Sequence, residues 1–182
     1  MHDPARPTPW TTELRTISKH ELYHELAAEL DGLLSGELDF VANAANAAAA
    51  IYHALPELNW AGFYFLHGGE LVLGPFQGRP ACVRIALGKG VCGTAAEERR
   101  TMLVPDVEAF PGHIACDAAS RSELVVPLFA GDALLGVLDL DSPVLGRFEA
   151  ADQEGCEMLA RIIEQHLHPQ DVVGRAMPGH DA

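Results

Sequence analysis

Four cysteines and three strand-end carboxylates are the side chains of this 182-residue chain whose types and spacing could do chemistry. The thiolate is the nucleophilic form of cysteine, and its environment controls how much of it exists at neutral pH. The cysteines stand at positions 82, 92, 116 and 156. None of them forms a Cys-x-x-Cys pair, so neither a zinc knuckle nor a thioredoxin motif is indicated. A zinc site built from three thiols and His113 stays open as a minor alternative.

Cys116 lies in the stretch GHIACDAASRSE (residues 112–123), which has no apolar period and runs into an apolar segment. This pattern predicts a loop that feeds a strand, a common position for reactive groups. His113 in its cationic form would lower the pKa of Cys116, and Asp117 would raise it; the sequence does not decide between them. Cys92 lies in the first turn of an expected helix, where backbone N–H groups favour the thiolate.

The carboxylates Asp139 and Asp141 alternate with leucines at the end of an expected strand. A period of two places both acids on one face, about 7 Å apart. Glu123 begins the neighbouring strand of the same expected hairpin. Strand-end acids often face solvent, but the flanking residues are apolar, and buried acids need a partner. That partner is either a ligand ammonium group or a basic side chain such as Lys89.

Residues 60–66 contain four aromatic side chains and are expected to form a strand. Trp60 and Tyr64 share one face of this strand, and Phe63 and Phe65 share the other. Phenylalanine fits a core, whereas tryptophan and tyrosine have polar tips that also suit the wall of a pocket.

The net charge of −14 comes from 12 basic and 26 acidic residues. Such a surface repels phosphate backbones and anionic lipids, so nucleic acid and membranes are not expected partners. The chain has no run of about 18 apolar residues, and its first residues lack the apolar core of a signal peptide. We therefore expect a cytoplasmic protein whose cysteines rest as thiols.

The elements that must position these residues follow from apolar periodicity, capping signals and turns. The fold class predicted is α+β, with a central antiparallel sheet of about six strands sandwiched by helices. Residues 1–17 are expected to be flexible, 18–167 to form one domain, and 168–182 to form a tail. Cys156 lies on the apolar stripe of the last helix and is expected to be buried. Helices are expected at 18–34, 38–55, 94–99 and 148–167, and strands at 60–66, 71–73, 82–87, 102–104, 124–129 and 133–141.

Five blocks of this sequence resemble the free methionine-(R)-sulfoxide reductases, a family of stand-alone GAF-domain enzymes. The blocks are NWAGFYFL (59–66), LVLGPFQGRPACVRI (71–85), GVCGTA (90–95), GHIACDAASRSELVVPL (112–128) and GVLDLDSPVLGRF (136–148). The similarity covers roughly residues 59–166, and the N-terminal helices fit the usual start of a GAF domain. A lone GAF-like pattern would be weak evidence, whereas this combination of long blocks is specific.

The resemblance implies a cysteine-based reduction of free methionine-R-sulfoxide, in the repair of oxidative damage. Cys116 resembles the cysteine that attacks the sulfoxide sulfur and becomes a sulfenic acid. Cys82 resembles the cysteine that reacts with this sulfenic acid and forms a redox-active disulfide. Cys92 resembles a third redox cysteine of the family. Which of the two forms the disulfide with Cys116 stays open. The family's substrate pocket corresponds to Trp60, Tyr64, Glu123, Asp139 and Asp141.

A sulfoxide oxygen must be protonated to leave, and Glu123 or Asp141 with a raised pKa could supply that proton. The resemblance implies no bound cofactor and no metal, regeneration by thioredoxin and NADPH, and a homodimer as one option. The alternative is a GAF module that binds a small ligand, or senses redox state, without turnover.

Overall fold

A six-stranded sheet forms the centre of the computed structural model, which describes residues 17–112 and 118–167. The strand order is β3-β2-β1-β6-β5-β4, and each neighbouring pair is antiparallel. The strands are β1 (Trp60–His67), β2 (Glu70–Gly78), β3 (Arg84–Ala86), β4 (Met102–Val104), β5 (Ser122–Ala130) and β6 (Ala133–Ser142).

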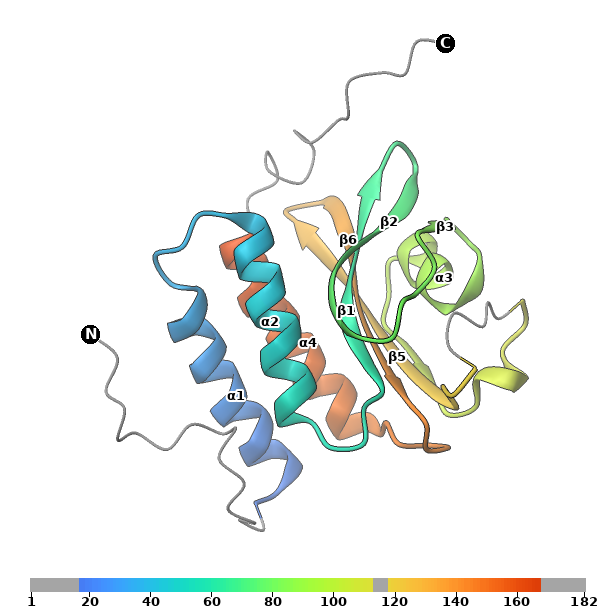
Figure 1. The fold of residues 1–182 in the computed structure, drawn as a ribbon, viewed down its shortest axis with the longest axis horizontal. Coiled ribbons are helices and arrows are strands. Elements are labelled where there is room, and N and C mark those ends of the chain that lie inside the picture. Colours follow the sequence, from blue (N-terminus) through green and yellow to red (C-terminus); the bar gives the residue numbers. More distant parts are fainter. Residues whose placement is uncertain (1–16, 113–117, 168–182) are drawn as a thin grey trace.

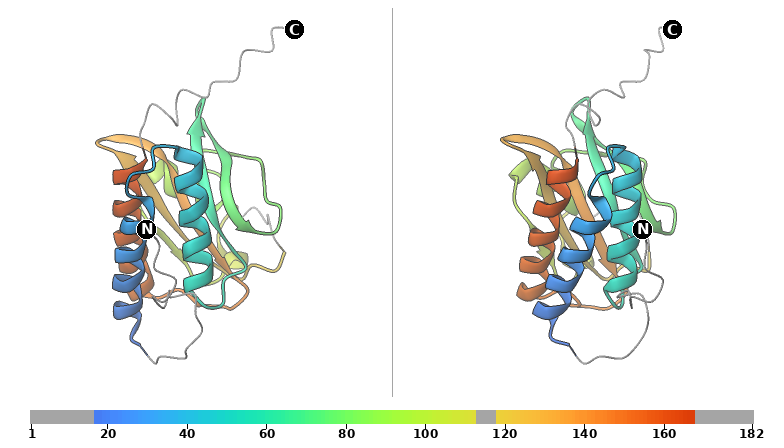
Figure 2. Two further views of the ribbon diagram at one scale, coloured as in Figure 1. Left: turned by 60° about the vertical axis from the view of Figure 1, so that its left-hand side comes forward. Right: turned by 90° about the vertical axis from the view of Figure 1, so that its left-hand side faces the viewer.

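Helices cover both faces of this sheet, as Figures 1 and 2 show. Three long helices form a layer on one face, and a short helix packs on the other. The long helices are α1 (Lys19–Leu34), α2 (Phe40–Ala54) and α4 (Ala150–His166); the short one is α3 (Gly90–Glu98), and a 3-10 turn, η1, spans Val107–Ala109. None of the helices in the described ranges is long and apolar enough to span a bilayer.

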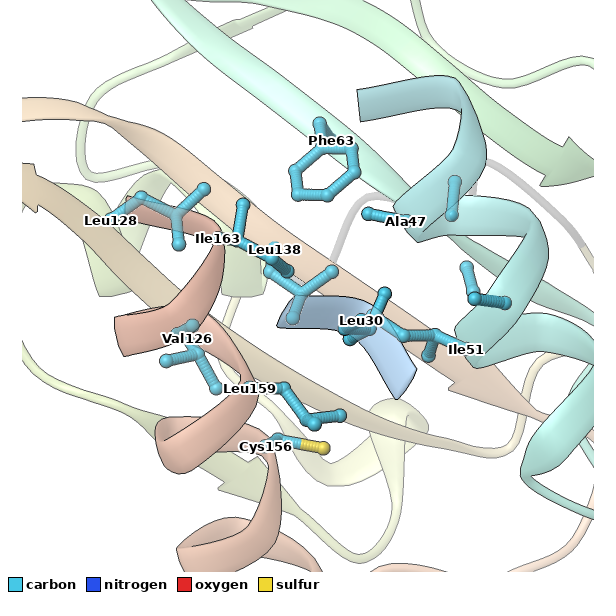
Figure 3. Packing of buried hydrophobic residues seen from close by; sticks show 14 of the residues in the cluster. Leu30, Ala47, Ile51, Phe63, Val126, Leu128, Leu138, Cys156, Leu159 and Ile163 are labelled. Atoms are coloured by element: carbon cyan, nitrogen blue, oxygen red, sulfur yellow. The ribbon is translucent and has the colours of Figure 1, made fainter. Parts of the chain in front are cut away.

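Alternation along the strands divides the apolar side chains between two clusters. Phe63 and Phe65 of β1 pack against the three-helix layer, together with leucines from β5 and β6 (Figure 3). Trp60 and Tyr64 of the same strand belong to the second cluster, beneath α3. Each central strand is therefore buried on both faces, which accounts for its continuous apolar sequence.

The expected α+β fold is confirmed, with its six strands and helices on both faces. Ser18 and Glu21 form the expected capping box at the start of α1. Several elements differ in extent. Strand β2 runs over Glu70–Gly78, well beyond the expected 71–73. Strand β3 is restricted to Arg84–Ala86, so Cys82 lies in the connection that precedes it. Helix α3 begins at Gly90, and Gly93 is needed there because a Cβ would lie 2.3 Å from the Ala86 carbonyl oxygen.

A buried charge network ties α4 to the rest of the helical layer. The Asp152 carboxylate accepts hydrogen bonds from Lys19 Nζ at 2.6 Å, Tyr23 Oη at 3.0 Å and Arg147 Nη1 at 3.1 Å. Arg147 Nε also donates to the Pro56 carbonyl, 3.0 Å away, in the turn that leads into β1. Burial alone would raise the pKa of Asp152, but hydrogen bonds from Lys19, the Glu149 N–H and Arg147 lower it. The network thus joins the N-terminal ends of α1 and α4 to the segment before β1 and to the segment after β6.

We expect Asp152→Asn to lower the free energy of unfolding by about 3 kcal/mol, because it leaves the buried Arg147 guanidinium without its charge partner. Urea denaturation monitored by circular dichroism measures this change. The control is Glu70→Gln, which removes the exposed ion pair with Arg84 and should cost less than about 1 kcal/mol. Equal effects of the two substitutions would contradict a structural role for the buried network.

Candidate active site

The strand register brings the three carboxylates together on the α3 face of the sheet. Trp60 of β1 lies opposite Asp141 of β6, and Asp141 lies opposite Glu123 of β5. Asp139, two residues earlier in β6, lies opposite Gly62 of β1. Directly opposed residues of antiparallel strands project to the same face. The expectation that Glu123, Asp139 and Asp141 share a face is therefore confirmed.

These carboxylates line a pocket between the sheet, α3 and the segment that follows β2. Its empty space is about 510 Å³, counting the mouth that is open to solvent. Within the described part of the chain, Lys89 is the one basic residue of its wall. The lining residues are Trp60, Tyr64, Pro80, Ala81, Ile85, Lys89, Gly90, Val91, Cys92, Ser120, Glu123, Asp139 and Asp141.

Stacked aromatic rings form one wall of this pocket. The Trp60 ring lies 5.3 Å from the Phe76 ring and 5.8 Å from the Tyr64 ring, with interplanar angles of 13° and 22°. Trp60 Nε1 donates to the Arg79 carbonyl at 3.1 Å, which fixes the indole against the segment after β2. Gly62 makes room for this stack, because a Cβ there would lie 2.3 Å from Phe76 Cβ and 2.8 Å from Trp60 Cη2.

Cys92 lies in the first turn of α3, as expected, but its environment does not favour a thiolate. The side chain is buried, and its Sγ donates to Glu123 Oε1 at 3.8 Å. Burial raises the pKa of Cys92 well above its usual value, and the charges of Asp139 and Glu123 raise it further. The expectation that the helix N-terminus favours the thiolate is therefore wrong, since desolvation and two acids outweigh the backbone N–H groups.

Glu123 and Asp139 form a coupled pair of buried acids, each about 95% buried. Burial raises the pKa of Asp139 to about 7, although hydrogen bonds with Cys92 and Glu123 hold it down. Burial and then the charges of Asp139 and Asp141 raise the pKa of Glu123 well above its usual range. These shifts favour the protonated form of Glu123. One oxygen of the Asp139 carboxyl group, Oδ1, is buried and has no hydrogen-bond partner among the described residues.

The other cysteines occupy different environments. Cys82 is disulfide-bonded, whereas Cys92 and Cys156 are free thiols. Cys156 lies on the buried face of α4 and donates to Tyr23 Oη at 3.7 Å, which confirms its expected place in the core. Burial raises the pKa of its thiol to about 12. Cys116 and His113 lie outside the described residues.

Several residues of the site escaped prediction from the sequence. Phe76 joins the aromatic wall from β2, and Gly62 lies under the stack. Asn59 donates from its backbone to the Asp141 carbonyl at 3.0 Å and from Nδ2 to Ser120 Oγ at 3.0 Å. Gly62, between Trp60 and Phe63 in the sequence, could have indicated that an aromatic ring lies flat on β1 at this point. The contacts of Asn59 and Phe76 depend on cross-strand register, which has no local signal.

The pocket also contains a set of potential metal ligands. Cys92 Sγ and one carboxylate oxygen each of Glu123 and Asp139 all lie within 4.8 Å of one another. The same groups can hold a proton, an ammonium group or a divalent cation, because each is an acceptor when deprotonated. Together with the aromatic wall, they can bind a small cationic or zwitterionic molecule next to a proton donor.

Comparisons with known proteins agree with this geometry. The GAF domain family matches residues 29–167. The free methionine-R-sulfoxide reductase of Escherichia coli is 48% identical over 155 residues, which cover 85% of this chain and 94% of that protein. The enzyme of the same name from Saccharomyces cerevisiae is 45% identical over 157 residues, covering 82% and 87% of the two chains. The X-ray structure of the Neisseria meningitidis free methionine-R-sulfoxide reductase with its substrate superposes with a TM-score of 0.82, at 43% identity, covering 86% of this chain and 95% of that one.

The sheet, its helical layers and the pocket under α3 together define a GAF domain. Relatives above 40% identity, covered over most of their length, narrow this class to one kind of oxidoreductase. The chain belongs to the free methionine-R-sulfoxide reductase family.

We expect Asp139→Asn to stabilise the protein at pH 8.5 by about 1–3 kcal/mol. An aspartate with a folded pKa of about 7 and an unfolded pKa of about 4 loses its stabilising contribution as the pH rises between these values. The substitution removes the buried charge, so its advantage should shrink at pH 5.

Urea denaturation at both pH values measures this difference, with the exposed turn variant Asp132→Asn as the control. A variant of Asp139 that is less stable than the wild type at pH 8.5 would show that the carboxylate stabilises the fold.

Proposed function

We propose that this chain reduces free methionine-R-sulfoxide to methionine with a cysteine nucleophile and an intramolecular disulfide. The observation that carries this proposal is the pairing, in one pocket, of a buried carboxyl group whose pKa is raised well above its usual range with a buried carboxylate oxygen that has no partner among the described residues. The protonated carboxyl group can donate a proton to the leaving sulfoxide oxygen, and the carboxylate oxygen can accept a hydrogen bond from the substrate ammonium group. Family membership supplies the choice of sulfoxide and of its R configuration.

The chemical step requires a thiolate, a proton donor and a second thiol. The Cys116 thiolate attacks the sulfoxide sulfur while Glu123 donates its proton to the oxygen. Methionine leaves with its sulfur reduced, and Cys116 is oxidised to a sulfenic acid. The thiol of Cys82 then displaces water from that sulfenic acid and forms a disulfide. Two thiols are thus oxidised for each sulfoxide reduced, and one water is released.

The states of the described cysteines support this division of roles. Cys82 is disulfide-bonded, while the two buried cysteines, Cys92 and Cys156, are free. The proposed reaction pairs Cys82 with Cys116 in its disulfide. We give Cys92 no part in the resting disulfide, because burial and two neighbouring acids keep its thiol protonated.

Selectivity for the free amino acid follows from the buried acids. Asp139 Oδ1 lacks a partner within the described structure, and Asp141 stands two residues further along the same strand. The α-ammonium group of a free amino acid can neutralise these carboxylates, whereas a residue within a peptide carries no such charge. A peptide would therefore leave a buried carboxylate unpaired, at a cost of about 1–3 kcal/mol or more. The Trp60–Tyr64 stack packs against the methyl thioether end.

The disulfide must be reduced before a second turnover. A thioredoxin-type protein, itself reduced with electrons from NADPH, regenerates both thiols by thiol–disulfide exchange. This cycle fits a reducing compartment, and we assign the chain to the cytoplasm, where it would repair oxidised free methionine.

The proposal predicts thioredoxin-dependent NADPH oxidation that requires free methionine-R-sulfoxide. Cys116→Ser should abolish turnover, because no other thiol replaces the nucleophile. Cys156→Ser is the matched control and should keep nearly full activity, since its thiol lies on the opposite face of the sheet from the pocket. Absence of turnover by the wild-type chain would favour the alternative of a binding or sensing GAF module, and loss of activity in Cys156→Ser would contradict the assignment of the cysteines.

Glu123→Gln should lower kcat by about 100-fold or more, since it removes the proton donor while keeping its size. The raised pKa of Glu123 favours its neutral form in the folded enzyme, so we expect little change in thermal stability. Steady-state kinetics and thermal melting measure the two effects, and the exposed Glu108→Gln serves as the control. Equal losses of stability and activity would identify Glu123 as a structural acid instead.

A further inference from the structure

Three buried side chains from three different elements converge beside the pocket. Cys92 belongs to α3, Glu123 to β5 and Asp139 to β6, and each is at least 94% buried. Their potential ligand atoms, one sulfur and two carboxylate oxygens, all lie within 4.8 Å of one another. The proposed reduction uses the carboxyl groups but has no task for the Cys92 thiol.

The spacing of these atoms suits a tetrahedral metal ion. Zinc binds thiolate at about 2.3 Å and carboxylate oxygen at about 2.0–2.2 Å, which corresponds to a sulfur–oxygen separation of about 3.5–3.7 Å. The observed distance from Cys92 Sγ to Glu123 Oε1 is 3.8 Å. The Cys92–Glu123 separation therefore lies within a few tenths of an ångström of that in a zinc complex, and Asp139 offers an oxygen within 4.8 Å of both atoms.

A second, independent observation points to a cation at this place. Asp139 Oδ1 is buried and has no hydrogen-bond partner within the described residues. Leaving a buried acceptor unsatisfied costs free energy, and a cation bound beside it would recover that cost. The donor set also discriminates among cations, because magnesium and calcium prefer oxygen ligands alone, whereas a thiolate with two carboxylates suits zinc and its neighbours.

We propose that Cys92, Glu123 and Asp139 form a binding site for a zinc-type divalent cation, which competes with the ammonium group of the amino-acid substrate. The three side chains supply one thiolate and two carboxylates, and a water molecule completes the tetrahedron. Binding requires the deprotonated form of each of the three ligands. A cation here occupies the carboxylate that the substrate needs, so it acts as an inhibitor. This inhibitory part rests on the proposed function.

Direct binding is tested in the full chain carrying Cys82→Ser and Cys116→Ser, which leaves Cys92 and Cys156 as its thiols. Titration with Co²⁺ should produce the absorption of a tetrahedral thiolate complex at one ion per chain, and Zn²⁺ should displace it. Adding Cys92→Ser should abolish the thiolate-to-metal band, and adding Asp139→Asn should weaken binding at least tenfold.

Matched controls are Cys156→Ser and Asp132→Asn, which should leave Co²⁺ binding unchanged. Unchanged binding after Cys92→Ser or Asp139→Asn would overturn the site, as would the absence of any thiolate band in the parent. None of these readouts depends on turnover, so the site can stand or fall separately from the proposed reductase activity.

Competition is tested with the wild-type sequence in the thioredoxin-coupled assay. Zn²⁺ should raise the KM for free methionine-R-sulfoxide without lowering kcat, and a chelator should reverse the effect. Cys92→Ser should lose this competitive inhibition. Zinc inhibition that persists in Cys92→Ser, or that lowers kcat alone, would place the inhibitory ion on other thiols and overturn the competitive part of the proposal.

Discussion

The site depends on the burial of two carboxyl groups, Glu123 and Asp139, beside the half-buried Asp141 on one face of a single sheet. Like charges in a medium of low polarity cannot all stay ionised, so the pair of Glu123 and Asp139 shares its charge unequally. Burial and the neighbouring acids raise the pKa of Glu123 well above its usual range, and burial raises the pKa of Asp139 to about 7. In the proposed reaction, one strand hairpin thereby supplies both a proton donor and an acceptor for positive charge.

Burying the carboxyl groups of the pocket costs free energy, which must be offset by stabilising contacts elsewhere in the molecule. The face of the sheet opposite the pocket supplies it through the apolar layer under α1, α2 and α4 (Figures 2 and 3). The Arg147–Asp152 pair then joins the segment after β6 to α4, and Arg147 also holds the turn before β1. These links reach the two strands that carry Trp60 and the pocket aspartates. The apolar contacts that stabilise the fold and the buried acids that destabilise it thus lie on the same strands, but on opposite faces of the sheet.

The cysteines illustrate how environment separates identical groups. Cys156 behaves as a small apolar residue, and Cys82 takes part in a disulfide. Cys92 is held as a thiol by burial and by the acids beside it. Such a thiol is a poor nucleophile because it resists deprotonation, yet a metal ion can displace its proton and take its place among the two carboxylates. The same burial that keeps Cys92 a thiol suits it to the proposed cation site.

Local sequence patterns determined the secondary structure of this protein and the face of the sheet on which key side chains lie. Apolar periodicity and capping signals predicted the helices and six strands, and the period of two placed Asp139 with Asp141 and Trp60 with Tyr64, because side-chain direction along a strand is a local property. The position of Cys92 in the first turn of a helix was predicted, but its pKa shift was predicted with the wrong sign. Only the tertiary structure decided that sign, since it depends on how closely α3 packs on acids that are 31 and 47 residues away in the chain. Desolvation and charge act through space, and sequence spacing does not encode them.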